Sequence, residues 1–243
     1  MTSEYWNDLK DYLGKVADQQ GWLGESIAVT ARALSGIEAI GRPSHDDYPL
    51  LKGKESIVEA VFRDARGHAF TDMPGHFRGT VEEVLAMPLA DNYERAVFVA
   101  TLNAVLRKAG LIEKTVHCKD DEPVECAKEL AEYITREFGA PKVFQVGCQP
   151  RMAEALSRKF EFRITDMDAD NLGKAIGDAK IEPDTAAAAD IEWCDVVVAT
   201  GTAFANDTAQ QFIEGGKPVV FYGVTCAGPA HVLGLTRFCP KAK

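Results

Sequence analysis

Two thiols, one imidazole and several carboxylates lie within ten consecutive residues of this chain, from His117 and Cys118 to Cys126. Thiolate and imidazole are the groups that soft and borderline metal ions prefer, and carboxylates add harder oxygen ligands. The run therefore predicts a site for a thiophilic or transition metal ion, with these three residues as ligands. The alternative is structural, because acidic residues are favoured in the first turn of a helix and Cys126 could pack in the core with Leu130.

A closed zinc site needs four ligands, so at least one more must come from a distant segment. Cys239, near the C-terminus, is a predicted metal ligand if the tail folds back onto this region. The other candidates are Cys148, Cys226, His45, His68, His76 and His231. The chain has six cysteines but no two of them are separated by two residues, which argues against a zinc ribbon or a thioredoxin-type dithiol.

The second half of the chain alternates short, Val-rich runs with segments of helical periodicity. The predicted strands are 142–147, 162–166, 195–201 and 218–223, and the predicted helices are 124–138, 150–160 and 208–214. Continuous apolar strands that alternate with helices are typical of a parallel sheet covered on both faces. We predict a Rossmann-like parallel-sheet domain over residues 128–243.

The first half has a different pattern. Apolar residues at spacings of three and four predict a helix over residues 4–20, and further helices are expected from residue 81 and over 92–109, the last ending at Gly110. Residues 26–34 read as a strand, and residues 56–63 and 68–71 as a hairpin with Gly67 in its turn. Residues 1–127 are thus predicted to form an α+β domain, and the whole chain an α/β protein.

In an open parallel sheet, ligands bind beyond the carboxyl ends of the strands. Four loops of this kind follow the predicted strands, and they carry small, polar or thiol side chains. Their candidate ligand-binding residues are Cys148 in the first loop, Asp166 and Asp168 in the second, Thr200, Gly201, Thr202, Asn206 and Thr208 in the third, and Cys226 in the fourth.

Two chemistries are open at this edge. The first loop lacks the three glycines of a dinucleotide fingerprint, which disfavours NAD. Asp166 or Asp168 could hold the ribose of a nucleotide-like or S-adenosylmethionine-like ligand, or could lie in a solvated turn. The loop from Thr200 could form an anion-binding nest, or could only cap the following helix through Asn206 or Asp207.

The charge balance is acidic, with 27 basic and 37 acidic residues and a formal net charge of −10. Nucleic-acid partners are therefore not expected, and no apolar stretch approaches the roughly 20 residues that span a bilayer. The N-terminus lacks the basic and apolar regions of a secretory signal, so we expect a cytoplasmic protein with a metal ion or small molecule as its partner. The sequence leaves open whether the chain forms a homo-oligomer and whether it catalyses a reaction.

Several stretches together resemble one family. They are residues 51–55, 69–72, 100–104, 222–225 and 237–240, with the most specific being Thr200-Gly201-Thr202 followed by Asn206 and Thr208. From about residue 26 onward the chain resembles the DUF364 family of heavy-metal chelation proteins, with its companion N-terminal domain DUF4213.

The resemblance implies an N-terminal domain like that of enolase, a Rossmann-like C-terminal domain and a site in the cleft between them. It also implies a heavy-metal role, with Asn103 and the residues of the Thr200–Thr208 loop at positions that match family motifs. Two hypotheses follow: a protein that binds a thiophilic metal, or an enzyme with a nucleotide-like or S-adenosylmethionine-like ligand on the sheet edge.

Overall fold

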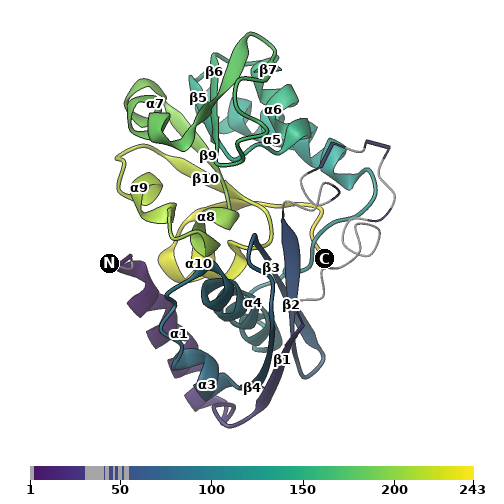
Figure 1. Ribbon diagram of the computed structural model, residues 1–243, viewed down its shortest axis with the longest axis vertical. Coiled ribbons are helices and arrows are strands. Elements are labelled where there is room, and N and C mark those ends of the chain that lie inside the picture. Colours follow the sequence, from purple (N-terminus) through teal and green to yellow (C-terminus); the bar gives the residue numbers. More distant parts are fainter. Residues whose placement is uncertain (1–2, 31–40, 42–43, 46, 49–50, 52–54) are drawn as a thin grey trace.

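The computed structural model describes residues 3–30, 41, 44–45, 47–48, 51 and 55–243, and within them the chain builds two β-sheets (Figure 1). The first is antiparallel, with the order β3-β2-β1-β4. Its strands are β1 (Ser26–Thr30), β2 (Ser56–Phe62), β3 (Ala65–Thr71) and β4 (His76–Thr80). The end of the predicted strand over 26–34 lies outside the described residues, and β4 was not predicted.

The predicted hairpin is confirmed, but the predicted turn position is wrong. Phe62 pairs with Ala65, so the turn consists of Arg63 and Asp64, with Arg63 at φ 53°. Gly67 lies inside β3, where an added Cβ would be 2.3 Å from the carbonyl oxygen of Ala100. The glycine is needed for the close approach of β3 to a helix and not for a turn.

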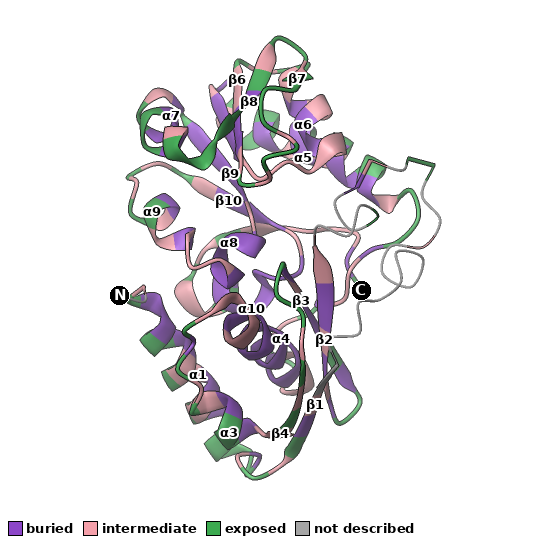
Figure 2. Cartoon of the chain, in the orientation of Figure 1, coloured by how far each residue is buried: buried purple, intermediate pink, exposed green. Residues whose placement is uncertain are grey.

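That helix, α4 (Asn92–Lys108), is the centre of the first half. It lies against β2 and β3 on one side and contacts α1 (Tyr5–Gln19), α8 (Thr202–Ala205) and α10 (Ala227–Leu233) on others. Burial all around the helix explains why its sequence is apolar on every face (Figure 2). The short α3 (Val81–Leu85) begins at a capping box between Thr80 and Glu83, so all three helices predicted in this half are confirmed.

The second sheet has the order β11-β10-β9-β5-β6-β8-β7, parallel except for the edge strand β7. Counted from β5, the six parallel strands run 3-2-1-4-5-6, the order of the doubly wound nucleotide-binding folds. Its strands are β5 (Val143–Val146), β6 (Phe162–Asp166), β7 (Ala175–Ile176), β8 (Ala179–Pro183), β9 (Val196–Thr200), β10 (Val219–Tyr222) and β11 (Thr236–Phe238). The predicted α/β class, with an α+β part followed by a parallel sheet, is confirmed.

Helices cover both faces of this sheet. The helices are α5 (Glu122–Phe138), α6 (Pro150–Ser157), α7 (Ala187–Trp193), with a 3-10 turn over Asp184–Ala186 before it, and α9 (Ala209–Ile213). Val196 and Val198 pack in the cluster that contains α5 and α6, whereas Val197 packs with residues of α7 and α9. The alternation shows why these strands are apolar at every position.

Several elements were missed because their signals are short. They are β4, β7, β8, β11, α7, α8 and α10. The segment with Thr115 and Val116 is irregular and belongs to no strand. Instead Val116 exchanges two backbone hydrogen bonds with Lys243, of 2.8 and 2.9 Å, which attaches the C-terminal tail to the middle of the chain.

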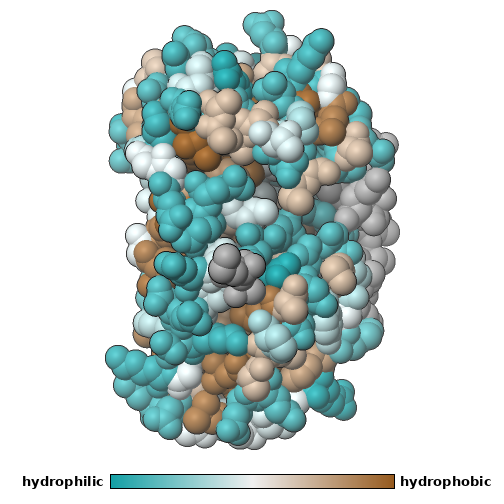
Figure 3. All heavy atoms as spheres, turned by 60° about the vertical axis from the view of Figure 1, so that its left-hand side comes forward, coloured by the Kyte–Doolittle hydropathy of each residue, from teal (hydrophilic) through white to brown (hydrophobic). Residues whose placement is uncertain are grey.

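The two sheets share one apolar cluster, which contains Phe98 of α4, Phe204 of α8 and Phe221 of β10. The predicted domain boundary at residue 127 lies inside α5, and the division of the chain into domains 1–127 and 128–243 stays a prediction. On the face shown in Figure 3 hydrophilic residues dominate and apolar ones occur in separate groups. Among the described residues, no helix is long and apolar enough to cross a membrane.

Candidate functional site

A cavity of about 410 Å³ lies at the carboxyl ends of β5, β6, β9 and β10. All four predicted loops contribute to its wall, through Cys148, Asp166, Thr200 and Thr225 among others. The opposite wall comes from the first half of the chain, with Glu55, Phe70 and Asp72, and from the segment that contains His117 and Cys118. The sheet edge that the sequence predicted as a ligand site therefore faces a hollow built by both halves.

Asp166 holds the first two loops in place. One carboxylate oxygen accepts a hydrogen bond of 2.5 Å from the backbone N–H of Cys148, and the other accepts one of 2.6 Å from the N–H of Asp168. Asp168 in turn accepts from the N–H of Asp170 at 3.0 Å. Asp166 and Asp168 both line the cavity, and the three hydrogen bonds given above are typical of side chains that stabilise turns.

The third loop is more compact than the sequence suggested. Thr200 Oγ1 accepts from the N–H of Thr202 at 3.3 Å, and a short helix, α8, begins there at once. The alternative that Asn206 or Asp207 caps the next helix is wrong, because the N-cap of that helix is Thr208, which makes no side-chain capping hydrogen bond. Thr200, Gly201, Thr202, Asn206 and Thr208 all line the cavity.

Asp207 instead faces the N-terminal helix. At φ 57°, its carboxylate accepts from the indole N–H of Trp6 at 2.7 Å and from the hydroxyl of Tyr5 at 3.3 Å. Burial and the neighbouring Asp207 carboxylate raise the pKa of Tyr5. Helix α1, which carries no predicted site residue, is thereby attached to a loop of the cavity wall.

Four of the six cysteines reach the cavity: Cys118, Cys126, Cys148 and Cys239. Cys118 and Cys126 interact directly, and the sulfur of Cys126 together with burial raises the pKa of Cys118. The pKa of Cys126 is lowered because the Cys118 thiol donates to it and a backbone group of Lys241 adds a second hydrogen bond. Cys126 is therefore the first of the pair to become a thiolate.

The C-terminal tail brings in another of these four sulfurs. Arg237 donates to the carbonyl of Gly223 at 3.0 Å and to that of Glu113 at 3.3 Å, which fixes the tail beside the sheet edge. Cys239 follows two residues later, and burial raises the pKa of its thiol. The fold thus gathers Cys118, Cys126 and Cys239 from a loop, a helix and the tail.

Two predicted ligand residues lie outside this cavity wall. Cys226 is fully buried, its thiol donates to the carbonyl of Gly223, and burial raises its pKa to about 12. Asn103 is also fully buried, where it joins α4 to β3 and to the loop after β10. Neither is part of the described lining.

Of the histidines, His117 alone belongs to the described lining. His68 is buried, and its Nδ1 accepts from the backbone N–H of His117 at 3.2 Å. Its Nε2 therefore carries the proton and donates to Glu59 at 2.9 Å. His45 lies beside Arg151 and His231 beside Tyr12, so these side chains are engaged elsewhere.

The sequence did not single out the acidic character of the wall. Its carboxylates are Glu55, Asp72, Asp120, Asp166, Asp168 and Asp184, and the described lining contains no Lys or Arg. Burial, with Asp166, Asp72 and Asp168 nearby, raises the pKa of Glu55 to about 7. Tyr222, whose hydroxyl donates to the carbonyl of Gly147 at 2.9 Å, also has a raised pKa because it is buried.

A signal for Glu55 and Asp72 was present, since both lie in stretches that carry the family resemblance. The spacing of residues along the sequence does not show that Glu55 and Asp72 face the sheet edge, because the two halves of the chain meet only in the folded structure. Within the described part of the chain, no three His, Cys, Asp or Glu side chains stand close enough to enclose a metal ion without rearrangement.

Comparison with known proteins agrees with this architecture. Residues 130–230 match the model of the DUF364 family, whose description is "Putative heavy-metal chelation". No curated protein gives a significant match to the chain.

Two solved structures of DUF364 proteins of unknown function are similar to this chain. One, from Pyrococcus horikoshii, superposes with a TM-score of 0.54 at 14% identity, over 90% of this chain and 78% of the other. The second, from Desulfitobacterium hafniense, has a TM-score of 0.49 at 17% identity, over 74% of this chain and 73% of the other. At these identities the first likeness supports the fold alone.

Proposed function

We propose that this protein binds a thiophilic metal ion in the cavity between its two halves, through Cys118 and Cys126 with Cys239 as a third sulfur ligand. The observation that carries the proposal is the convergence of these thiols, from three separate segments, on one cavity. The family match, with its description of heavy-metal chelation, supports the same chemistry.

The electrostatics favour a cation. The described lining contains carboxylates and thiols and no Lys or Arg side chain, so its charge attracts positive ions. Soft thiolate ligands select ions such as Cu⁺ and Zn²⁺ over Mg²⁺ and Ca²⁺. His117, in the same wall, supplies an imidazole as a further ligand.

Binding requires a proton to leave and side chains to move. Cys126 reaches the thiolate form first, and Cys118 must lose the proton that it donates to Cys126. Affinity therefore rises with pH. Because the side chains do not enclose an ion as they stand, binding also needs rotation of the thiols toward a common point.

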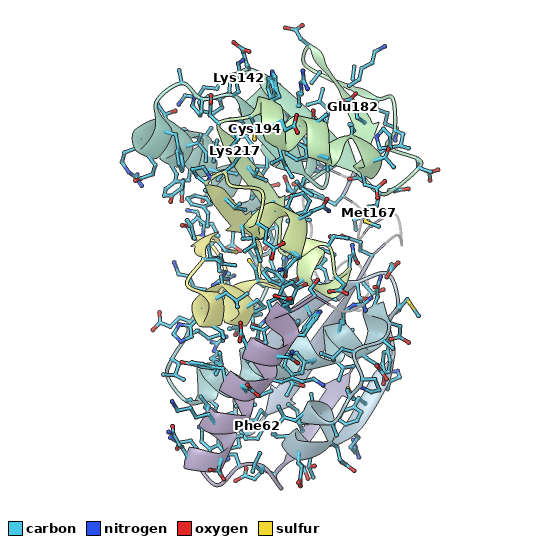
Figure 4. All side chains as sticks on the ribbon, turned by 90° about the vertical axis from the view of Figure 1, so that its left-hand side faces the viewer. Phe62, Lys142, Met167, Glu182, Cys194 and Lys217 are labelled. Carbon is cyan, nitrogen blue, oxygen red and sulfur yellow. The ribbon has the colours of Figure 1, made fainter. Side chains whose placement is uncertain are left out.

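The test is metal binding by protein purified anaerobically under reducing conditions. Titration with Cd²⁺, followed by its ultraviolet thiolate-to-metal charge-transfer band, should reach a stoichiometric end point in the wild type. The Cys118→Ser, Cys126→Ser double variant should lose the band. Cys194→Ser is the matched control, because Cys194 is fully buried, lies beside Lys217 outside the described lining, and donates to the carbonyl of Ile191 (Figure 4).

An unchanged end point in the double variant would refute the proposal. Loss of binding in the Cys194→Ser control as well would show that folding, and not ligation, had been disturbed.

A second candidate is an enzyme with a nucleotide-like or S-adenosylmethionine-like ligand. It is favoured by the strand order and by Asp166, which ends the second strand of that order, where an acidic residue can hold a ribose. The acidic lining disfavours phosphate groups. A ligand at 100 times its dissociation constant stabilises a protein by about 2.7 kcal/mol, so a thermal-shift screen with nucleosides, nucleotides and S-adenosylmethionine decides this candidate.

A further inference from the structure

We infer that the carboxylate end of the cavity, formed by Glu55, Asp72, Asp166 and Asp168, binds the ammonium group of a small organic amine. This site is distinct from the proposed metal site and does not depend on it. The charged groups that act on Glu55 are the other three carboxylates, whereas those that act on Cys118 are Cys126, Cys239 and Glu122. One cavity therefore has a carboxylate end and a thiol end.

Glu55 is the group at this end that a ligand would engage. Asp72 accepts from the amide of Asn92 at 2.8 Å, and both oxygens of Asp166 accept backbone N–H groups. For Glu55, which lies in the same wall, no described residue donates a hydrogen bond. Glu55 thus lines the cavity without a described hydrogen-bond partner.

Negative charges that are buried close together are unfavourable in free energy unless a cation binds beside them. Burial and three neighbouring carboxylates raise the pKa of Glu55 to about 7, in the direction that this cost requires. No Lys or Arg in the described lining offsets the cost of these negative charges, so a positively charged ligand would lower it. The hydroxyl of Tyr222, which donates to Gly147, keeps oxygen lone pairs that accept an N–H.

The spread of these carboxylates suits an organic cation. Within the described residues, no three acidic, thiol or imidazole side chains surround a single point at metal–ligand distances. An ammonium group has three N–H donors, and because hydrogen bonds are longer than metal–ligand bonds it can bind acceptors that are farther apart.

Size and wall composition agree with this choice. The volume of about 410 Å³ corresponds to roughly a dozen water molecules, which is room for a small organic molecule. Apolar side chains of Val146, Met152 and Phe212 line the same cavity and suit a hydrocarbon chain.

The experiment is calorimetric titration with 1,4-diaminobutane at low salt and pH 8, where Glu55 is ionised. The wild type should bind it, and Glu55→Gln should weaken binding at least tenfold, equivalent to about 1.4 kcal/mol. Asp72→Asn serves as a second variant. Glu182→Gln is the matched control, because Glu182 is exposed on β8 and outside the lining (Figure 4), and should bind as the wild type does.

Three results would overturn the inference. They are absence of binding to the wild type, equal affinity of Glu55→Gln and Glu182→Gln, and competition by Mg²⁺ or Ca²⁺ at equal concentration, which would identify a metal site. The Cys118→Ser, Cys126→Ser variant separates the two proposals: it should lose Cd²⁺ yet bind the amine normally, and loss of the amine there would mean that one site, not two, occupies the cavity.

Discussion

The side chain of Asn103 is expected to hold the fold together, and its removal should be among the most damaging single changes. Its Nδ2 donates to the carbonyls of His68 at 2.9 Å and Val224 at 3.1 Å, and its Oδ1 accepts from the N–H of Gly228 at 2.6 Å. These bonds join α4 to β3 and to the loop that follows β10. Asn103→Ala leaves all three of these backbone groups without their hydrogen bond to the side chain.

The magnitude follows from the count of lost bonds. A buried group left without its hydrogen bond costs about 1–3 kcal/mol, so three such losses should lower the free energy of unfolding by roughly 4 kcal/mol. With a urea dependence of about 3 kcal/mol per molar for a chain of this size, the unfolding midpoint should fall by about 1.3 M. Far-UV circular dichroism and tryptophan fluorescence should give coincident transitions if unfolding is two-state.

Thr101 supplies the contrast on the same helix. It is fully buried, and its Oγ1 has no hydrogen-bond partner among the residues that the structure describes. Thr101→Val keeps the shape and removes an unsatisfied hydroxyl, so stability should stay unchanged or rise by up to about 1 kcal/mol. A loss below about 1 kcal/mol for Asn103→Ala, or an equal loss for both variants, would refute the reasoning from satisfied and unsatisfied polar groups.

Three further changes test other contacts. Gly67→Ala places a Cβ 2.3 Å from the carbonyl oxygen of Ala100, so β3 must move off α4, and the free energy of unfolding should fall by about 3 kcal/mol in urea. Asp207→Ala loses the 2.7 Å bond to Trp6 and should cost about 2 kcal/mol, whereas Asp207→Asn keeps an acceptor and a side chain suited to positive φ. Because the pKa of Glu55 is raised from 4.5 to about 7, the folded state holds a proton that the unfolded state releases, so stability should fall as pH rises through that window. Urea midpoints measured against pH should show this slope in the wild type and lose it in Glu55→Gln.

Each of these has a contrary result. A fully stable Gly67→Ala variant would mean that the strand and helix are not in close contact. An unchanged tryptophan emission and stability in Asp207→Ala would mean that α1 docks without this contact. A pH slope retained in Glu55→Gln would assign the proton to another group.

Much of the fold could be predicted because it is encoded locally. The threefold and fourfold spacing in residues 4–20 identified α1, and continuous Val-rich runs identified β5, β9 and β10. Short elements such as β7 and β11 carry too few residues for a periodic signal.

One side of the candidate site, the loops at the edge of the parallel sheet, was also predicted from the sequence. The loops after β5, β6, β9 and β10 were expected at one edge because parallel strands end together. The family resemblance chose Asn103 and the sheet-edge reasoning chose Cys226, but the fold places both outside the described cavity lining. Residue type alone does not distinguish a side chain that faces a hollow from one that joins two segments in the core.

The sequence by itself determined the class of fold, the edge of the parallel sheet that carries polar loops, and the concentration of sulfur between His117 and Cys126. Only the tertiary structure decided which of these residues meet. The backbone pairing of Val116 with Lys243 brings Cys239 to the cavity, and the packing of the two halves sets Glu55 opposite Asp166. Local periodicity reports which face of an element is buried, whereas contacts between distant segments depend on how whole elements pack, and no short pattern records that.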